Sequence, residues 1–108
     1  MTTARDIIRL VLEDIDIEIK IQESSLQYAE EKKKKLFAEK KSAMTEGTDF
    51  ATACVKFDHS IGFHSAMELE CEEKLEALKR MRDRYELLDK RIAKEASLEA
   101  MREVEENE

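Results

Sequence analysis

Residues 13–23, EDIDIEIKIQE, decide the fold, because their pattern fits two different secondary structures. Apolar residues alternate with polar ones, and the apolar residues are Ile15, Ile17, Ile19 and Ile21. Such alternation of β-branched residues is typical of a half-buried strand. The alternation is short, however, and the surrounding residues 3–45 include neither proline nor glycine. A strand there would have no second strand to pair with, so we predict a helix.

The composition also indicates long helices. The chain has 108 residues, 42% of them charged, with no proline and two glycines. Abundant Ala, Glu, Lys, Leu and Arg without proline is typical of long helices or a coiled coil. A β-sandwich or β-barrel would need many turns, and turn-forming residues are scarce here. The length indicates a single helical domain over residues 1–108.

On a helix, with about 100° per residue, the four isoleucines divide between two faces. Ile15 and Ile19 belong to an apolar seam at heptad-like spacing. The seam consists of Ile8, Leu12, Ile15, Ile19, Leu26, Ala29, Leu36 and Ala43. Ile17 and Ile21 fall on nearly the opposite face, in a second stripe with spacings of seven, four and seven residues. This second stripe consists of Leu10, Ile17, Ile21 and Tyr28.

The second stripe predicts an interface. A simple two-helix hairpin would leave it in water, and exposed apolar patches of this kind usually mark an interaction site. A second copy of the chain, another protein, or a short helix near residues 50–60 could cover it. We expect a homodimer that also binds an unidentified protein partner.

The segment TEGTD, residues 45–49, is the clearest break in the helical pattern. Gly47 can adopt the left-handed conformation that ends a helix. Thr48 or Asp49 can then cap the next helix. At the start of the chain, Thr3 and Asp6 have the spacing of a capping box. We therefore predict a first helix over about residues 3–45.

Gly62 leaves two interpretations of the second half. A glycine within a helix costs about 1 kcal/mol relative to alanine, which a long helix can absorb. If the second helix is unbroken, the lysines at residues 32–35 lie opposite residues 60–63. A short helix or kink in a connection over residues 46–62 would shift the register. The lysines would then face Glu70, Glu72 and Glu73, and Asp14, Asp16 and Glu18 would face Lys90, Arg91 and Lys94. These complementary charges favour the second interpretation, with a helix over about residues 63–104 and a frayed acidic tail at 105–108.

Aromatic and soft apolar residues gather around this predicted connection. They are Phe50, Phe57, Phe63 and Met67, and they lie on both sides of Gly62. They either pack the tip of the hairpin or form a docking or hinge segment, since Phe and Met are common interface anchors.

No constellation of residues indicates catalysis. His64, Glu68 and Cys71 share a helix face and are possible metal ligands, but Cys71 is more simply a small core residue. The chain has no HExxH motif, no Gly-rich phosphate loop and no nucleophile elbow. We expect no metal, no cofactor and no enzymatic activity. Cys54 is, like Cys71, expected to be a reduced thiol.

The charge bears on partners and location. The net charge is −7, whereas direct binding to nucleic acid needs a basic surface. The lysines at 32–35 stand between acidic residues and are expected to form a solvated helix face. No apolar run approaches the roughly 20 residues that span a bilayer, and no signal peptide is evident. We expect a cytoplasmic protein with no membrane partner.

Together these features predict an all-α fold. It is a long antiparallel helical hairpin of coiled-coil type, with a short helix or kink at the connection, pairing into a dimeric helical bundle. The expected function is a non-enzymatic protein-interaction module, such as an adaptor, chaperone or small regulator. One alternative is an acidic inhibitor, of phage or counter-defence type, that blocks a basic nucleic-acid-binding surface. Another is a helical-hairpin stalk or escort protein of a secretion apparatus.

Overall fold

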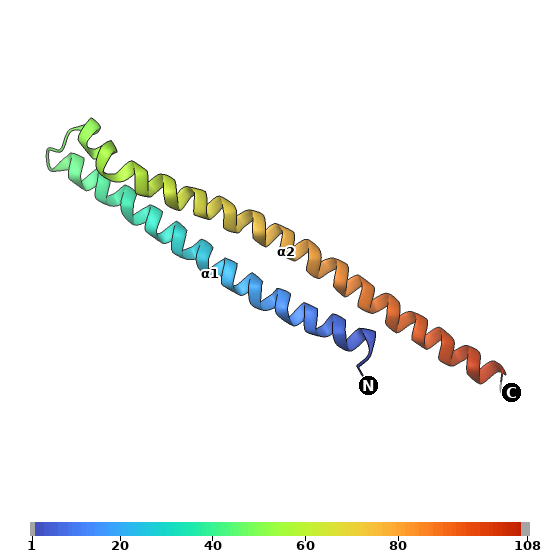
Figure 1. The fold of residues 1–108 in the computed structure, drawn as a ribbon. Coiled ribbons are helices and arrows are strands. Elements are labelled where there is room, and N and C mark those ends of the chain that lie inside the picture. Colours follow the sequence, from blue (N-terminus) through green and yellow to red (C-terminus); the bar gives the residue numbers. More distant parts are fainter. Residues whose placement is uncertain (1, 107–108) are drawn as a thin grey trace. The chain divides into compact units, whose positions relative to one another are not determined.

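The computed structural model describes residues 2–106, which form two antiparallel helices joined by a short connection (Figure 1). Helix α1 spans Ala4–Thr45 and helix α2 spans Phe50–Glu106. There is no β-strand in residues 2–106. The predicted all-α helical hairpin is confirmed. The alternating stretch at residues 13–23 lies wholly within α1.

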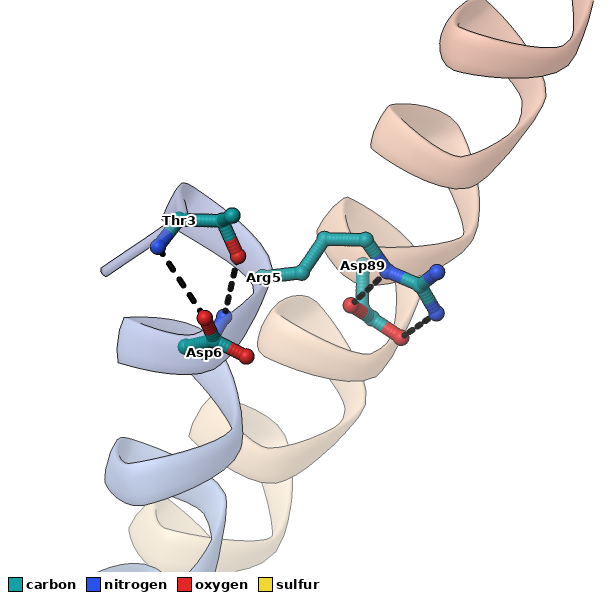
Figure 2. A network of polar contacts seen from close by, with 4 residues as sticks. All are labelled: Thr3, Arg5, Asp6 and Asp89. Atoms are coloured by element: carbon teal, nitrogen blue, oxygen red, sulfur yellow. Dashed lines mark hydrogen bonds and ion pairs between the residues drawn. The ribbon is translucent and has the colours of Figure 1, made fainter. Parts of the chain in front are cut away.

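A reciprocal capping box begins α1, as the sequence predicts. The backbone N–H of Asp6 donates to Thr3 Oγ1 at 3.2 Å, and the Thr3 N–H donates to Asp6 Oδ2 at 3.0 Å (Figure 2). Both N–H groups would otherwise lack a partner, because the first turn of a helix has no preceding carbonyl groups. These hydrogen bonds hold the pKa of Asp6 below its ordinary value.

A glycine-terminated turn ends α1. Gly47 has a φ of +111°, which is the left-handed region. Its N–H donates to the Met44 carbonyl at 3.2 Å, and the Thr48 N–H donates to the Ala43 carbonyl at 3.0 Å. This pair of bonds is the Schellman motif. Asp49 then caps α2, since its Oδ2 accepts from the Thr52 N–H at 3.2 Å.

Helix α2 is longer at both ends than the sequence predicts. It begins at Phe50 and continues through Gly62 to Glu106, so the prediction of a separate short helix within residues 46–62 is wrong. Buried Phe57 and Ile61 precede the glycine, and their packing outweighs a helical cost of about 1 kcal/mol. The first turns of α2 do lean away from the direction of the turns that follow (Figure 1). Residues 105–106, which the sequence predicts to belong to a frayed tail, are helical, while 107–108 lie outside the described residues.

The helices divide into two compact units, and the first comprises Met1–Ile19 and Ala77–Glu108. Helix α1 contributes the predicted seam residues Ile8, Ile15 and Ile19, all buried. Helix α2 contributes the half-buried Leu78, Tyr85 and Ile92. Met81 and Leu88 fit the apolar pattern in the sequence but are each 42% exposed. The prediction of a single domain stays a prediction.

Ion pairs cross between the helices of the first unit. The Arg5 guanidinium donates to both carboxylate oxygens of Asp89, at 2.9 and 3.2 Å (Figure 2). Asp16 and Arg82 approach to 3.8 Å. The sequence placed Asp16 opposite Lys90, Arg91 and Lys94, so this part of the predicted register is wrong.

The second unit comprises Lys20–Glu76. Its buried core consists of Ala29, Ala53, Phe57, Ile61, Cys71 and Leu75. Lys33 pairs with Glu68 at 3.0 Å, and Lys40 pairs with Asp58 at 2.7 Å. Lys33 therefore does not pair with Glu70, Glu72 or Glu73. Lys32 and Lys35 line one groove with Ser60 and His64, which is the register expected of an unbroken second helix.

The register prediction fails for an energetic reason. Exposed ion pairs contribute about 0–1 kcal/mol each, and the favoured register rested on such pairs alone. Burying one large apolar side chain contributes about 1.5–3 kcal/mol. The core residues Phe57, Ile61 and Leu75 therefore determine the register, and charged residues pair where it allows.

Gly62 provides a test of this structure. A Cβ built at Gly62 has no heavy atom within 4 Å, although the residue lies inside a helix. We expect Gly62→Ala to stabilise the chain by about 1 kcal/mol, because alanine has the higher helix propensity. Urea unfolding followed by circular dichroism measures this. Gly47→Ala is the matched control and should destabilise, because its φ is +111°. A destabilised Gly62→Ala variant would contradict an unbroken α2.

The Arg5–Asp89 pair predicts a dependence of stability on pH. Hydrogen bonds from Arg5 hold the pKa of Asp89 below its ordinary value. A carboxyl group with a lowered pKa stabilises the fold at pH values above its unfolded-state pKa of about 4. This stabilisation is lost as the pH falls through the folded-state pKa. Asp89→Asn should therefore lower the melting temperature at neutral pH, and the difference from wild type should vanish once the pH lies below the lowered pKa of Asp89. Exposed Asp83→Asn is the control, and an equal loss in both variants would contradict the role of the pair.

Candidate protein-interaction surface

A single seam between two helices cannot cover the apolar side chains of this chain. Among residues 2–106, the large apolar side chains that are exposed outnumber those that are buried. Scattered exposed apolar residues are normal on a soluble protein. Groups that lie together on one surface are more informative, because they mark interaction sites.

The second stripe is exposed along its length. In the first unit, Leu10 and Ile17 are both 58% exposed. In the second unit, Ile21 is 50% exposed and Tyr28 is 51% exposed. No short helix covers them among the described residues, since residues 50–60 belong to α2 and contribute Phe57 to the core.

In the second unit, the ring of Tyr28 of α1 contacts the ring of His64 of α2, and the His64 ring in turn contacts that of Phe63. The His64 ring is 6.2 Å from that of Tyr28 and 5.3 Å from that of Phe63, between centroids. Phe63 is 64% exposed. Ring centroids at 4.5–7 Å are in favourable contact. We call these three residues, Tyr28, Phe63 and His64, the aromatic cluster.

A shallow groove of about 210 Å³ adjoins the aromatic cluster. It is lined by Tyr28, Lys32, Lys35, Leu36, Glu39, Ser60 and His64. The Lys32 ammonium lies 5.8 Å from the centroid of the Tyr28 ring, close enough for a cation–π contact. His64 Nδ1 lies 2.7 Å from the Ser60 carbonyl oxygen. Because a carbonyl only accepts, Nδ1–H is the donor of this hydrogen bond.

The predicted docking or hinge segment does not remain one site. Phe57 is buried in the core, and Met67 is half-buried. Phe63 joins the aromatic cluster. Phe50 is 69% exposed and lies under the Lys40 ammonium, 5.3 Å from the ring centroid. Gly62 lies within α2 as an ordinary helical residue. Of the phenylalanines in this segment, Phe50 and Phe63 expose their rings to solvent and Phe57 does not.

Spacing on α1 places Tyr28 in the second stripe, and local composition places Phe63 in the docking segment. Neither pattern joins the two residues. Both rings contact the ring of His64, a residue that the sequence pattern singles out as a possible metal ligand. The signal that could have joined them is the register of an unbroken second helix, which places α2 residues 60–63 near α1 residues 32–35.

The three possible metal ligands noted in the sequence are not brought together in the structure. Among the described residues, His64, Glu68 and Cys71 do not bring their ligand atoms together, whereas carboxylates of Glu30, Glu68 and Glu72 lie within 4.8 Å of one another. Glu68 is also paired with Lys33 at 3.0 Å. Glu30 and Glu72 are exposed, and exposed carboxylates on neighbouring turns are common without a metal. Cys71, buried, and Cys54, half-buried, are free thiols.

Comparisons with known proteins give no relative. No family model, no curated protein and no solved structure matches the chain. Neither α1 nor α2, over residues 2–106, includes a stretch long and apolar enough to cross a membrane.

Proposed function

We propose that the chain is a non-enzymatic protein-interaction module, an adaptor, chaperone or small regulator that binds through its helix surfaces. The observation that carries this proposal is the aromatic cluster. Tyr28 and Phe63, whose rings both contact that of His64 in the second unit, are more than half exposed. Aromatic residues are enriched at the cores of protein interfaces, where they account for much of the binding energy.

The chemistry around the cluster suits a helical or extended segment of another protein. Ile21 lies seven residues, or two helical turns, before Tyr28 on α1, and the spacing fits apolar anchors of a docked helix. Lys32 and Lys35 line the adjoining groove. They would favour acidic side chains beside the apolar anchor of the partner.

The exposed pair Leu10 and Ile17 of the first unit supports the same class of function. Both side chains are 58% exposed and lie seven residues apart on α1. We propose that these exposed surfaces bind another protein, and that the chain also associates with a second copy of itself.

A capture experiment tests the proposal. Immobilised wild-type chain should retain a specific set of proteins from an extract of its source cells, identified by mass spectrometry. The variant Tyr28→Ala/Phe63→Ala should retain about tenfold less of these proteins than wild type, as expected when interface anchors are truncated. Both residues are exposed, so circular dichroism should show an unchanged helix content.

The matched control is Val55→Ala. Val55 lies in the same unit, is 85% exposed and is outside the aromatic cluster. It should capture the same proteins as wild type. Equal capture by all three chains would contradict the assignment of the aromatic cluster as the docking surface.

A further inference from the structure

The last turns of α2 lie beyond the reach of α1 within the first unit. Arg5, in the first turn of α1, pairs with Asp89, and every residue from 94 to 106 is exposed. We call residues 94–106 the α2 extension. A helix segment of this length is marginal in water without packing. Its last turn carries acidic residues and no basic one, which the helix dipole disfavours.

One face of the α2 extension has the spacing of a coiled coil. Lys94, Leu98, Met101 and Glu105 follow one another at steps of four, three and four residues. Leu98 is 49% exposed and Met101 is 65% exposed. Two apolar residues thus stand between a cation and an anion on a single exposed face, which we call the extension face.

The order of charges makes the extension face complementary to itself. In an antiparallel pair of two such helices, Leu98 of each would meet Met101 of the other. In the same register, Lys94 of each would meet Glu105 of the other. The positive side chain would then stand near the C-terminal end of the other helix, where it also complements the dipole.

The residues that flank the extension face agree with the same register. Glu95 and Arg102 lie on one edge, where flanking residues of antiparallel helices meet, and they have opposite charges. The other edge carries the uncharged Ser97 and Val104. Glu99, Glu103 and Glu106 are placed away from the face, so the excess of acidic residues does not oppose pairing.

We propose that the α2 extension is a docking site for the α2 extension of a second copy of this chain. The contact is antiparallel and two-fold symmetric, so that both copies use the same surface. It deepens the proposed function, since it names the surface for the second copy and rests on the proposed self-association. It leaves the aromatic cluster available for another protein.

The docking surface is small, which sets the expected affinity. The α2 extension is roughly 20 Å long at 1.5 Å per residue, and a pair of such helices buries less than a standard interface of about 1,600 Å². We expect a dissociation constant in the range of roughly micromolar to hundreds of micromolar. The chain should therefore shift from monomer to dimer over a concentration series.

Charge reversal of the full chain tests the site by sedimentation equilibrium. Lys94→Glu alone and Glu105→Lys alone should each raise the dissociation constant about tenfold, because each places like charges opposite one another twice. The double variant Lys94→Glu/Glu105→Lys should restore the wild-type value. An equimolar mixture of the two single variants should form a mixed dimer, since their charges complement one another.

Two further variants separate this site from other surfaces. Leu98→Glu/Met101→Glu should abolish the dimer. Lys79→Glu reverses an exposed charge elsewhere on α2 and should leave the dissociation constant unchanged. A chain that stays monomeric at millimolar concentration would overturn the inference. So would a dimer that survives Leu98→Glu/Met101→Glu but is lost in Ile17→Glu/Ile21→Glu. The capture experiment on the aromatic cluster tests the proposed function independently of either result.

Discussion

The structure depends on one constraint, which is that a helix in a two-helix hairpin has a single neighbour and can bury a single seam. Ile8, Ile15 and Ile19 satisfy that constraint in one unit, and Phe57, Ile61 and Leu75 satisfy it in the other. Every further apolar stripe must stay in water or meet another molecule. The composition of α1, with isoleucines on opposite faces, therefore bears on association as directly as on folding.

The fold could be predicted from the sequence because its signals are local. The capping residues Thr3 and Asp6 and the left-handed Gly47 each act within about one turn, and the seam of α1 repeats every three or four residues along one helix. The structure has each of them where it was expected. The prediction of a break at Gly62 was wrong because it considered only the cost of a glycine within a helix. Whether that cost breaks the helix depends on how well α2 packs against α1. The sequence alone does not supply that packing.

The candidate site could be predicted only in parts. Tyr28 was assigned to an interface from its spacing on α1, and Phe63 was assigned to a docking segment from local composition. Placing these two residues in one cluster requires the register between the two helices. Burial of Phe57 and Ile61 sets that register, and the ion pairs predicted from the sequence do not. Lys33 illustrates this, since it pairs with Glu68 and not with the acidic residues expected for it.

The distribution of tyrosines between the two units has a spectroscopic consequence. The chain has no tryptophan and two tyrosines, with the exposed Tyr28 in one unit and the half-buried Tyr85 in the other. Each unit thus contains one intrinsic fluorophore in its own environment. Emission from chains with a single tyrosine replaced by phenylalanine would report on each unit separately, so that local opening of either part of the hairpin could be followed without an added label.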